Sequence, residues 1–166
     1  MKQVIKLFLV DNQKMHSGKK GLLPANIPQK TLNLVLSEHL MQEIHRYYRI
    51  KGTPEELYAA LINPFSITLW TGGEAVMKEE PGTPFSLFDG DIEGINLSFE
   101  KDHKIVQEWF FGDQTEKSIV TITLRPDRHY TKIELHHTNI PDEAYEDMSH
   151  GWDAYYFGGL KEFFEK

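Results

Sequence analysis

Cysteine is absent from the 166 residues, and no apolar stretch is long. Without cysteine the chain can form no disulfide framework, thiolate metal site or cysteine nucleophile, which fits a reducing cytoplasm. The N-terminal apolar run, Leu7 to Val10 behind Val4 and Ile5, is much shorter than the roughly 20 residues that cross a bilayer, and no small-residue cleavage site follows it. We therefore expect a cytoplasmic protein that neither enters a membrane nor is secreted.

Basic residues are outnumbered two to one by acidic residues after the first 30 positions. The formal net charge is −7, but residues 1–30 hold six lysines against one aspartate, which is +5 and leaves −12 for residues 31–166. An acidic body repels phosphate backbones, so nucleic-acid binding would depend on the lysine-rich segment alone. We therefore expect no nucleic-acid partner.

Motifs for metal binding and nucleophilic catalysis are also missing. His136 and His137 are adjacent and would point to opposite faces of a strand, and no second histidine stands at the spacing of an HExxH helix. There is no GxSxG elbow, and Thr121 and Thr123 read as ordinary strand residues. We expect the chain to hold no metal ion and no cofactor.

The residues that are present have the composition of one folded domain. Hydrophobic residues make up 40% and charged residues 26% of the chain, unlike disordered proteins. Residues 11–30 gather Asn, Gly, Lys and two prolines without a sustained period, which is typical of a loop or leader. We assign residues 1–38 to an N-terminal extension, disordered or holding a lone strand, and residues 39–166 to a single domain.

The domain is expected to begin with a strand and two short helices. Residues 41–50 alternate between apolar and polar side chains, which predicts a strand. Thr53 and Pro54 suit the N-cap and the first position of a helix that continues to about residue 62. Residues 64–70 are expected to form a further short helical segment before two glycines.

Six strand-like segments follow, rich in β-branched and aromatic residues and separated by turn-like letters. They are residues 74–80, 83–89, 95–99, 105–111, 118–125 and 131–140. A last helix is expected from about Asp142 to Phe164, because apolar residues recur there at every third or fourth position. These are Tyr145, Met148, Trp152, Tyr155 or Tyr156, Leu160 and Phe163. The order predicts an α+β helix-grip fold, in which a curved antiparallel sheet wraps around a long C-terminal helix.

Five stretches of the sequence resemble one known family, in that family's order. They are TPEELYAAL, DGDIEG, KIVQEWFF, SIVTITL and HGWDAYYFGGLKEFF, within residues 52–166. On these motifs the chain resembles the C-terminal-type domain of the activators of the heat-shock-protein-90 ATPase. That family is similar to the START-like, or SRPBCC, superfamily of birch-pollen-allergen-like helix-grip proteins. The resemblance implies a non-catalytic, co-chaperone-like role in the stress response, and the superfamily adds carriers of small ligands and a few cyclases or hydrolases.

Two polar side chains are expected on the inner face of the sheet. In the alternating segments 105–111 and 133–137, Gln107 and His137 share a face with apolar neighbours. A buried amide or imidazole needs a hydrogen-bond partner, so the pair either satisfies other core groups or orients a ligand. Both are candidate ligand-binding residues.

Aromatic residues are the other candidates for ligand binding. Trp70, Phe88, Trp109 and Tyr155 have large rings that suit a flat or lipid-like guest in a helix-grip cavity. The same rings could equally fill that cavity. The sequence leaves both alternatives open.

Carboxylates gather at the start of the last helix. Asp142, Glu143, Glu146 and Asp147 oppose the positive end of the helix dipole, and the same edge is a candidate surface for a basic partner. We therefore expect a binding module and no enzyme: a monomer or weak dimer that contacts a chaperone or another protein, or carries a small hydrophobic ligand. The alternative is an enzyme of this fold, a hydrolase or cyclase using His137 and a cavity threonine on a small apolar substrate.

Overall fold

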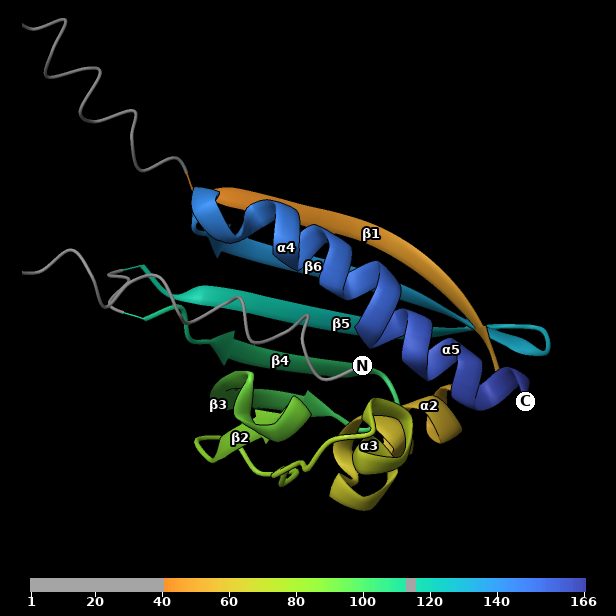
Figure 1. Ribbon diagram of the computed structural model, residues 1–166. Helices are drawn as coiled ribbons and strands as arrows, with labels where there is room; N and C mark the ends of the chain where they lie inside the picture. Colours follow the sequence, from red (N-terminus) through yellow and green to blue (C-terminus); the bar gives the residue numbers. More distant parts are fainter. Residues whose placement is uncertain (1–40, 113–115) are drawn as a thin grey trace, which may run out of the picture.

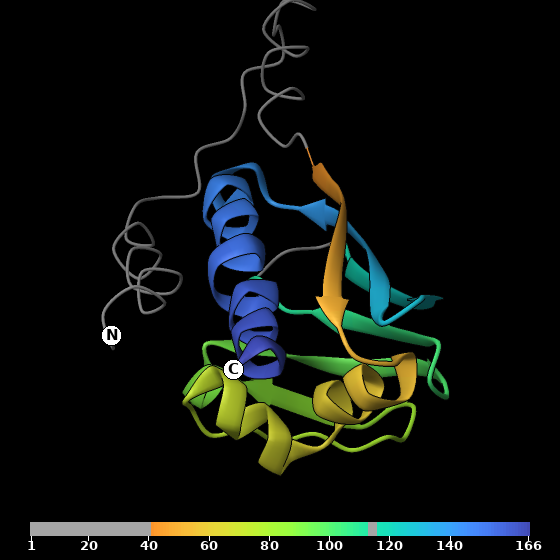
Figure 2. The same ribbon diagram turned by 90° about the vertical axis from the view of Figure 1, so that its right-hand side faces the viewer.

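The computed structural model describes residues 41–112 and 116–166. A six-stranded antiparallel sheet in the order β1-β6-β5-β4-β3-β2 curves around a long C-terminal helix, which lies along its concave face (Figures 1 and 2). The helix-grip fold predicted from the sequence is thereby confirmed. The expectations for residues 1–38, including the leader at residues 11–30, lie outside the described residues.

The sheet is a meander that is completed by the first strand. β1 pairs with β6 at one edge, and β2 forms the other edge. The alternation predicted for the first strand is confirmed, because Ile44 and Ile50 are buried while Glu43 and Arg49 are exposed. The strands are β1 (Gln42–Lys51), β2 (Pro84–Leu87), β3 (Ile92–Glu100), β4 (Lys104–Trp109), β5 (Ser118–Asp127) and β6 (Tyr130–Ile140).

The strand predicted at residues 74–80 is wrong. This segment contributes only an isolated bridge between Val76 and Ser86 at the edge of the sheet. Its Lys78 carbonyl accepts a hydrogen bond of 3.1 Å from the Asn96 side-chain amide, so this backbone group is satisfied without a strand partner. Charged residues and a proline at the end of the segment also disfavour strand pairing.

The two short helices predicted after the first strand are both present. α2 (Pro54–Ile62) begins with a capping box, in which Thr53 accepts from the Glu56 backbone and Glu56 accepts from the Thr53 backbone. Asn63 ends this helix and caps the next one, α3 (Pro64–Thr71), through its side-chain oxygen. The two prolines each occupy a first helical position, where a missing N–H costs nothing.

The C-terminal helix contains a π-helical turn that the sequence pattern does not reveal. Its parts are η4 (Asp142–Ala144), α4 (Tyr145–Gly151), the π turn η5 (Trp152–Tyr156) and α5 (Phe157–Glu165). A Cβ atom on Gly158 would lie 2.5 Å from the Asp153 carbonyl oxygen. Glycine therefore permits the close backbone approach that follows this turn.

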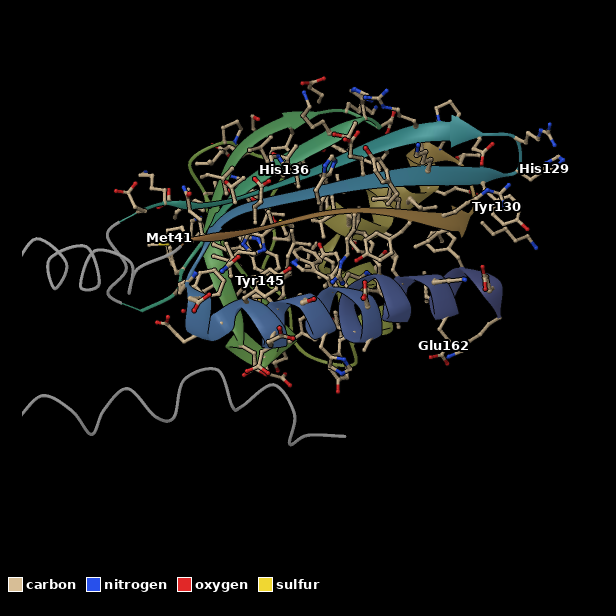
Figure 3. All side chains as sticks on the ribbon, turned by 90° about the horizontal axis from the view of Figure 1, so that it is seen from above. Met41, His129, Tyr130, His136, Tyr145 and Glu162 are labelled. Carbon is tan, nitrogen blue, oxygen red and sulfur yellow. The ribbon has the colours of Figure 1, made fainter. Side chains whose placement is uncertain are left out.

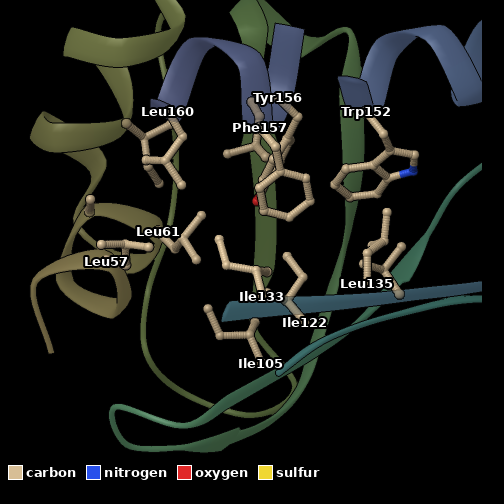
Figure 4. Packing of buried hydrophobic residues seen from close by; sticks show 14 of the residues in the cluster. Leu57, Leu61, Ile105, Ile122, Ile133, Leu135, Trp152, Tyr156, Phe157 and Leu160 are labelled. Carbon is tan, nitrogen blue, oxygen red and sulfur yellow. The ribbon is translucent and has the colours of Figure 1, made fainter. Parts of the chain in front are cut away.

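The π turn changes which aromatic residues face the sheet. Trp152, Tyr156 and Phe157 are all buried on the inner side of the helix (Figure 4), although a regular α-helix would turn Phe157 away from the other two. The inserted residue shifts the helix phase, so Phe163 is 37% exposed and the inward position predicted for it is wrong. Phe164 instead packs near Gly52.

The inner face of the sheet supplies the other half of the core. Branched side chains from three strands meet Trp152, Phe157 and Leu160 of the helix, and Figure 3 shows side chains filling the layer between helix and sheet. These strand residues include Ile105, Ile122, Ile133 and Leu135. Across residues 41–112 and 116–166, no helix has the length and apolar character needed to cross a membrane.

Candidate functional site

A small cavity lies between the C-terminal helix and the turn η3 (Phe88–Gly90). Its volume is about 50 Å³, far below the roughly 300–1,000 Å³ of a typical ligand pocket. The sheet and the helix are therefore separated mainly by packed side chains. The cavity is lined by Phe88, Ile92, Trp109, Asp147, Met148, His150, Gly151, Trp152, Tyr155 and Tyr156.

Stacked aromatic rings occupy most of the space in this region. The rings of Trp109 and Trp152 stack with their centroids 4.7 Å apart, so these tryptophans face each other across the core. The centroid of the Tyr156 ring lies 4.6 Å from that of Trp152 and 5.1 Å from that of Trp70. Phe88, Trp109 and Tyr155 of the predicted ligand set line the cavity, whereas Trp70 is not among the lining residues and donates to a backbone carbonyl of α2.

A wider groove opens beside the cavity, and Ile92, Trp109 and Met148 line both. Its volume is about 390 Å³. It is lined by Gly90, Asp91, Ile92, Glu93, Trp109, Phe110, Phe111, Gly112, Pro141, Glu143, Ala144 and Met148. We refer to the groove and cavity together as the acidic groove, because the described residues of its lining include four carboxylates (Asp91, Glu93, Glu143 and Asp147) and no lysine or arginine.

The predicted acidic edge borders this groove in part. Asp142, Glu143, Glu146 and Asp147 are all exposed, at η4 and the start of α4. Glu143 and Asp147 line the acidic groove, while Asp142 accepts a hydrogen bond of 2.7 Å from the Gln42 amide. Asp91 and Glu93, from the DGDIEG segment, add two further carboxylates to the lining. The role of the edge in partner binding stays a prediction.

His137 is buried in a hydrogen-bond cluster that determines its tautomer. The Trp152 indole N–H donates to Nδ1 of His137 over 3.1 Å, so Nδ1 must be the unprotonated nitrogen. Nε2 therefore carries the proton and donates to the Ser118 hydroxyl at 2.8 Å, and that hydroxyl donates to the Thr138 carbonyl. Burial, and to a smaller extent the nearby His136, lowers the pKa of His137 to about 3.

This geometry prevents His137 from acting as a base toward Ser118. The nitrogen that faces the hydroxyl already bears a proton, and a pKa of about 3 leaves the imidazole little tendency to accept a second one. Thr121 and Thr123 alternate along β5 with the residues that point inward, so their side chains lie on the other face of the sheet from His137. The cluster therefore lacks the features of a nucleophile and base pair.

Gln107 belongs to a second buried cluster. Its amide nitrogen donates to the Asn96 side-chain oxygen at 2.9 Å, and its amide oxygen accepts from the Trp109 indole at 3.2 Å. Asn96 in turn donates to Lys78 and Thr83. Because Gln107 and His137 each have partners within the core, neither needs a ligand to be satisfied. Their part in ligand binding stays a prediction.

Sequence reasoning missed Asn96 and Ser118, the partners of these two residues. Asn96 lies directly opposite Gln107 in the β3–β4 pair, so an aligned hairpin would have identified it. Ser118 lies opposite Trp109 in the β4–β5 pair, while His137 lies opposite Val120. Detecting Ser118 would have required the register of β5 against β6, in which Ser118 and His137 are diagonal neighbours.

The Tyr156 hydroxyl is the polar group of this region that lacks a partner. The residue is 4% exposed, and no hydrogen bond to its hydroxyl is formed within residues 41–112 and 116–166. Burial raises the pKa of its phenol. A buried hydroxyl without a partner is unfavourable, and Tyr156 also lines the cavity. A small guest or a water molecule in the cavity could satisfy it.

The histidines do not assemble into a metal centre in the described part of the chain. No group of three histidine, aspartate or glutamate residues there is arranged to hold a metal ion. His136 lies on the outer face of the sheet, as Figure 3 shows, and its ring nitrogen is 3.4 Å from Glu43.

Comparison with known proteins places the fold and its motifs in a family. The family model described as "Activator of Hsp90 ATPase homolog 1-like protein" matches residues 51–165. An activator of 90 kDa heat shock protein ATPase homolog from Dictyostelium discoideum is 31% identical over 103 residues, covering 60% of this chain and 27% of that protein. Homolog 1 from Homo sapiens is 29% identical over 114 residues, covering 68% of this chain and 34% of its own length.

A solved structure shows the same architecture. An HSP90 activator from Plasmodium falciparum superimposes with a TM-score of 0.68 at 26% identity, covering 73% of this chain and 94% of that one. The curated relatives above are much longer than this chain, which spans about a third of their length or less.

Proposed function

Because this chain belongs to the family of Activator of Hsp90 ATPase homolog 1-like proteins, we propose that its domain binds a chaperone of the 90 kDa heat-shock class through the acidic groove. The observation that supports this proposal best is the groove itself. It combines an apolar floor with four carboxylates, without a described lysine or arginine in its lining. Such a surface suits a partner segment in which apolar side chains alternate with basic ones.

The apolar side chains that reach solvent at the groove support a protein partner. Phe110 is 53% exposed and Phe111 is half-buried, and both follow directly after β4. Aromatic side chains are enriched among the residues that dominate the affinity of protein interfaces, and rim charges of one sign steer the approach of a partner of the other sign. Asp142, Glu143, Glu146 and Asp147 would form part of that rim.

We also propose that the domain acts without catalysis. The tautomer and low pKa of His137 support this, since an acyl-transfer mechanism would need a base beside the Ser118 hydroxyl. The enzymatic alternative, in which His137 works with a threonine, has less support because His137 bonds to a serine and an indole instead.

Reversing the charge on one side of the groove should weaken chaperone binding about tenfold, because rim carboxylates contribute to both steering and affinity. The variant is Glu143→Lys with Asp147→Lys in the full chain. Binding to a purified 90 kDa heat-shock protein is measured by titration calorimetry. The matched control, Glu162→Lys with Glu165→Lys at the other end of the helix, changes the net charge equally and should bind like the native chain. Equal losses in both variants, or no binding by the native chain, would contradict the proposed site.

The second candidate function is the carriage of a small apolar ligand, and it depends on the buried Tyr156 hydroxyl. Phe88, Trp109 and Tyr155 would supply the apolar walls, and the groove would supply the entrance. Since the cavity holds only about 50 Å³, side chains would have to move to admit a lipid or polycyclic aromatic molecule. The cavity walls would then be held in place by three buried residues outside the lining: Gln107, His137 and Trp70.

A ligand of this kind should raise the melting temperature, and Tyr156→Phe should weaken its binding about fivefold through the loss of one hydrogen bond. A thermal-shift screen with fatty acids and polycyclic ketones tests the first point, and titration of a hit tests the second. Tyr155→Phe is the control, because the half-buried hydroxyl of Tyr155 can bond to water. A screen without hits, or a hit that binds both variants alike, would reject Tyr156 as a ligand contact.

A further inference from the structure

The acidic groove has a complementary segment in this chain itself. Residues 2–10, KQVIKLFLV, contain six apolar residues and two lysines and have no acidic residue. The described lining of the groove has the opposite charge and a matching apolar floor that includes Ile92, Trp109 and Met148. We propose that residues 2–10 dock in the acidic groove of the same molecule. This inference rests on the groove being a peptide-binding surface, as proposed above, but it needs no chaperone.

The point where the segment joins the domain lies next to the groove. Gln42, at the start of β1, pairs with Ile140 and donates to Asp142, and the following residues Pro141 and Glu143 line the groove. Figure 3 shows Met41 at the same end of the molecule as Tyr145, opposite the turn at His129 and Tyr130. The segment is thus attached at the end of the sheet where the groove opens.

The intervening chain is long enough for the segment to return. Residues 11–40 are thirty residues, and a chain of that length can span up to about 100 Å when fully extended. Attachment to the same molecule gives the segment an effective concentration of the order of millimolar. A contact that would be weak between separate molecules is therefore sufficient for docking. The consequence is competition, because a chaperone segment could enter only after residues 2–10 have left.

The absence of cysteine makes the contact directly measurable in the full chain. Gln3→Cys introduces a single thiol for a nitroxide spin label and leaves every apolar residue and lysine of the segment in place. The amide signals of Phe111, Ala144 and Met148 in the ¹⁵N-labelled chain should lose more than half of their intensity. Those of Asp102 and Arg128, at the opposite end of the sheet, should keep theirs.

Charge variants test whether complementarity holds the segment. Lys2→Glu with Lys6→Glu should abolish the intensity loss, and so should Glu93→Lys with Glu143→Lys. A chain that carries all four substitutions should recover much of the intensity loss, because the charges are again opposite. An unfolded variant could not recover it. Raising the salt concentration from 50 to 500 mM should also weaken the effect, since exposed charges are screened.

Three outcomes would overturn the proposal. The signals of the groove could keep their intensity, or the loss could centre on another surface. The third is the same loss in ¹⁵N-labelled chain mixed with unlabelled, spin-labelled chain, which would make a second copy the occupant. Because no chaperone is present, failure of the chaperone titration leaves this test unaffected, and a negative spin-label result leaves that titration open.

Discussion

Replacing Trp152 by alanine should lower the free energy of unfolding by about 3–5 kcal/mol, the usual cost of removing a large buried aromatic side chain. Trp152 is 2% exposed and stacks on both Trp109 and Phe157. The change would also remove the N–H that donates to His137, leaving a buried nitrogen without its partner. Packing and hydrogen bonding therefore act in the same direction at this position.

Urea unfolding followed by circular dichroism, at one pH, measures this loss. Phe163→Ala is the matched control, because it removes a large aromatic residue from the same helix at a position that is 37% exposed. It should cost about 1 kcal/mol or less. If Trp152→Ala cost as little as the control, the stacked core would be wrong and the tryptophan would be available as part of a partner surface.

Local rules were sufficient to predict most of the fold. The alternation in residues 41–50 and the cap at Thr53 each depend on neighbours in sequence, and the structure reproduces both. Gln107 and His137 are buried as their alternation predicted. The strand predicted at residues 74–80 did not form, because its backbone groups bond to the Asp89 and Asn96 side chains and through an isolated bridge, and its charged residues disfavour strand pairing.

The π turn could not be predicted from residue spacing. The letters WDAYYFGG permit a regular helix with either Tyr155 or Tyr156 inside. The structure places Tyr156 and Phe157 inside together, because packing against the sheet favours both rings and Gly158 tolerates the distorted backbone. Such an insertion is decided by tertiary contacts, which periodicity does not contain.

The acidic groove was equally beyond the sequence. Its walls come from three places in the chain, the turn after β2, the end of β4 and the start of the C-terminal helix. The carboxylates of residues 142–147 were identified from the helix dipole alone, and nothing in the residue spacing linked them to Asp91 and Glu93. The curvature of the sheet brings these segments around one apolar floor. The carboxylates then line a single groove, which is a surface that a partner could bind.

The stability of the native chain should fall by about 2 kcal/mol more between pH 7 and pH 5 than that of His137→Gln. In the folded chain burial lowers the pKa of His137 to about 3, from the ordinary value of 6.5. Below pH 6.5 the unfolded chain therefore binds a proton at His137 that the folded chain does not bind. Each further decrease of the pH by one unit, down to about pH 3, lowers the free energy of unfolding. Glutamine keeps a donor and an acceptor at this position but does not titrate.

Urea unfolding of both chains at pH 7 and pH 5 gives this difference, in which the contributions of all other titrating groups cancel. The exposed His129, replaced by glutamine in the same way, is the matched control for the substitution itself. Parallel losses in the native chain and His137→Gln would mean that the folded protein admits a proton at His137. The indole N–H of Trp152 could then no longer donate to Nδ1, and His137 would again be available for acid–base chemistry beside Ser118.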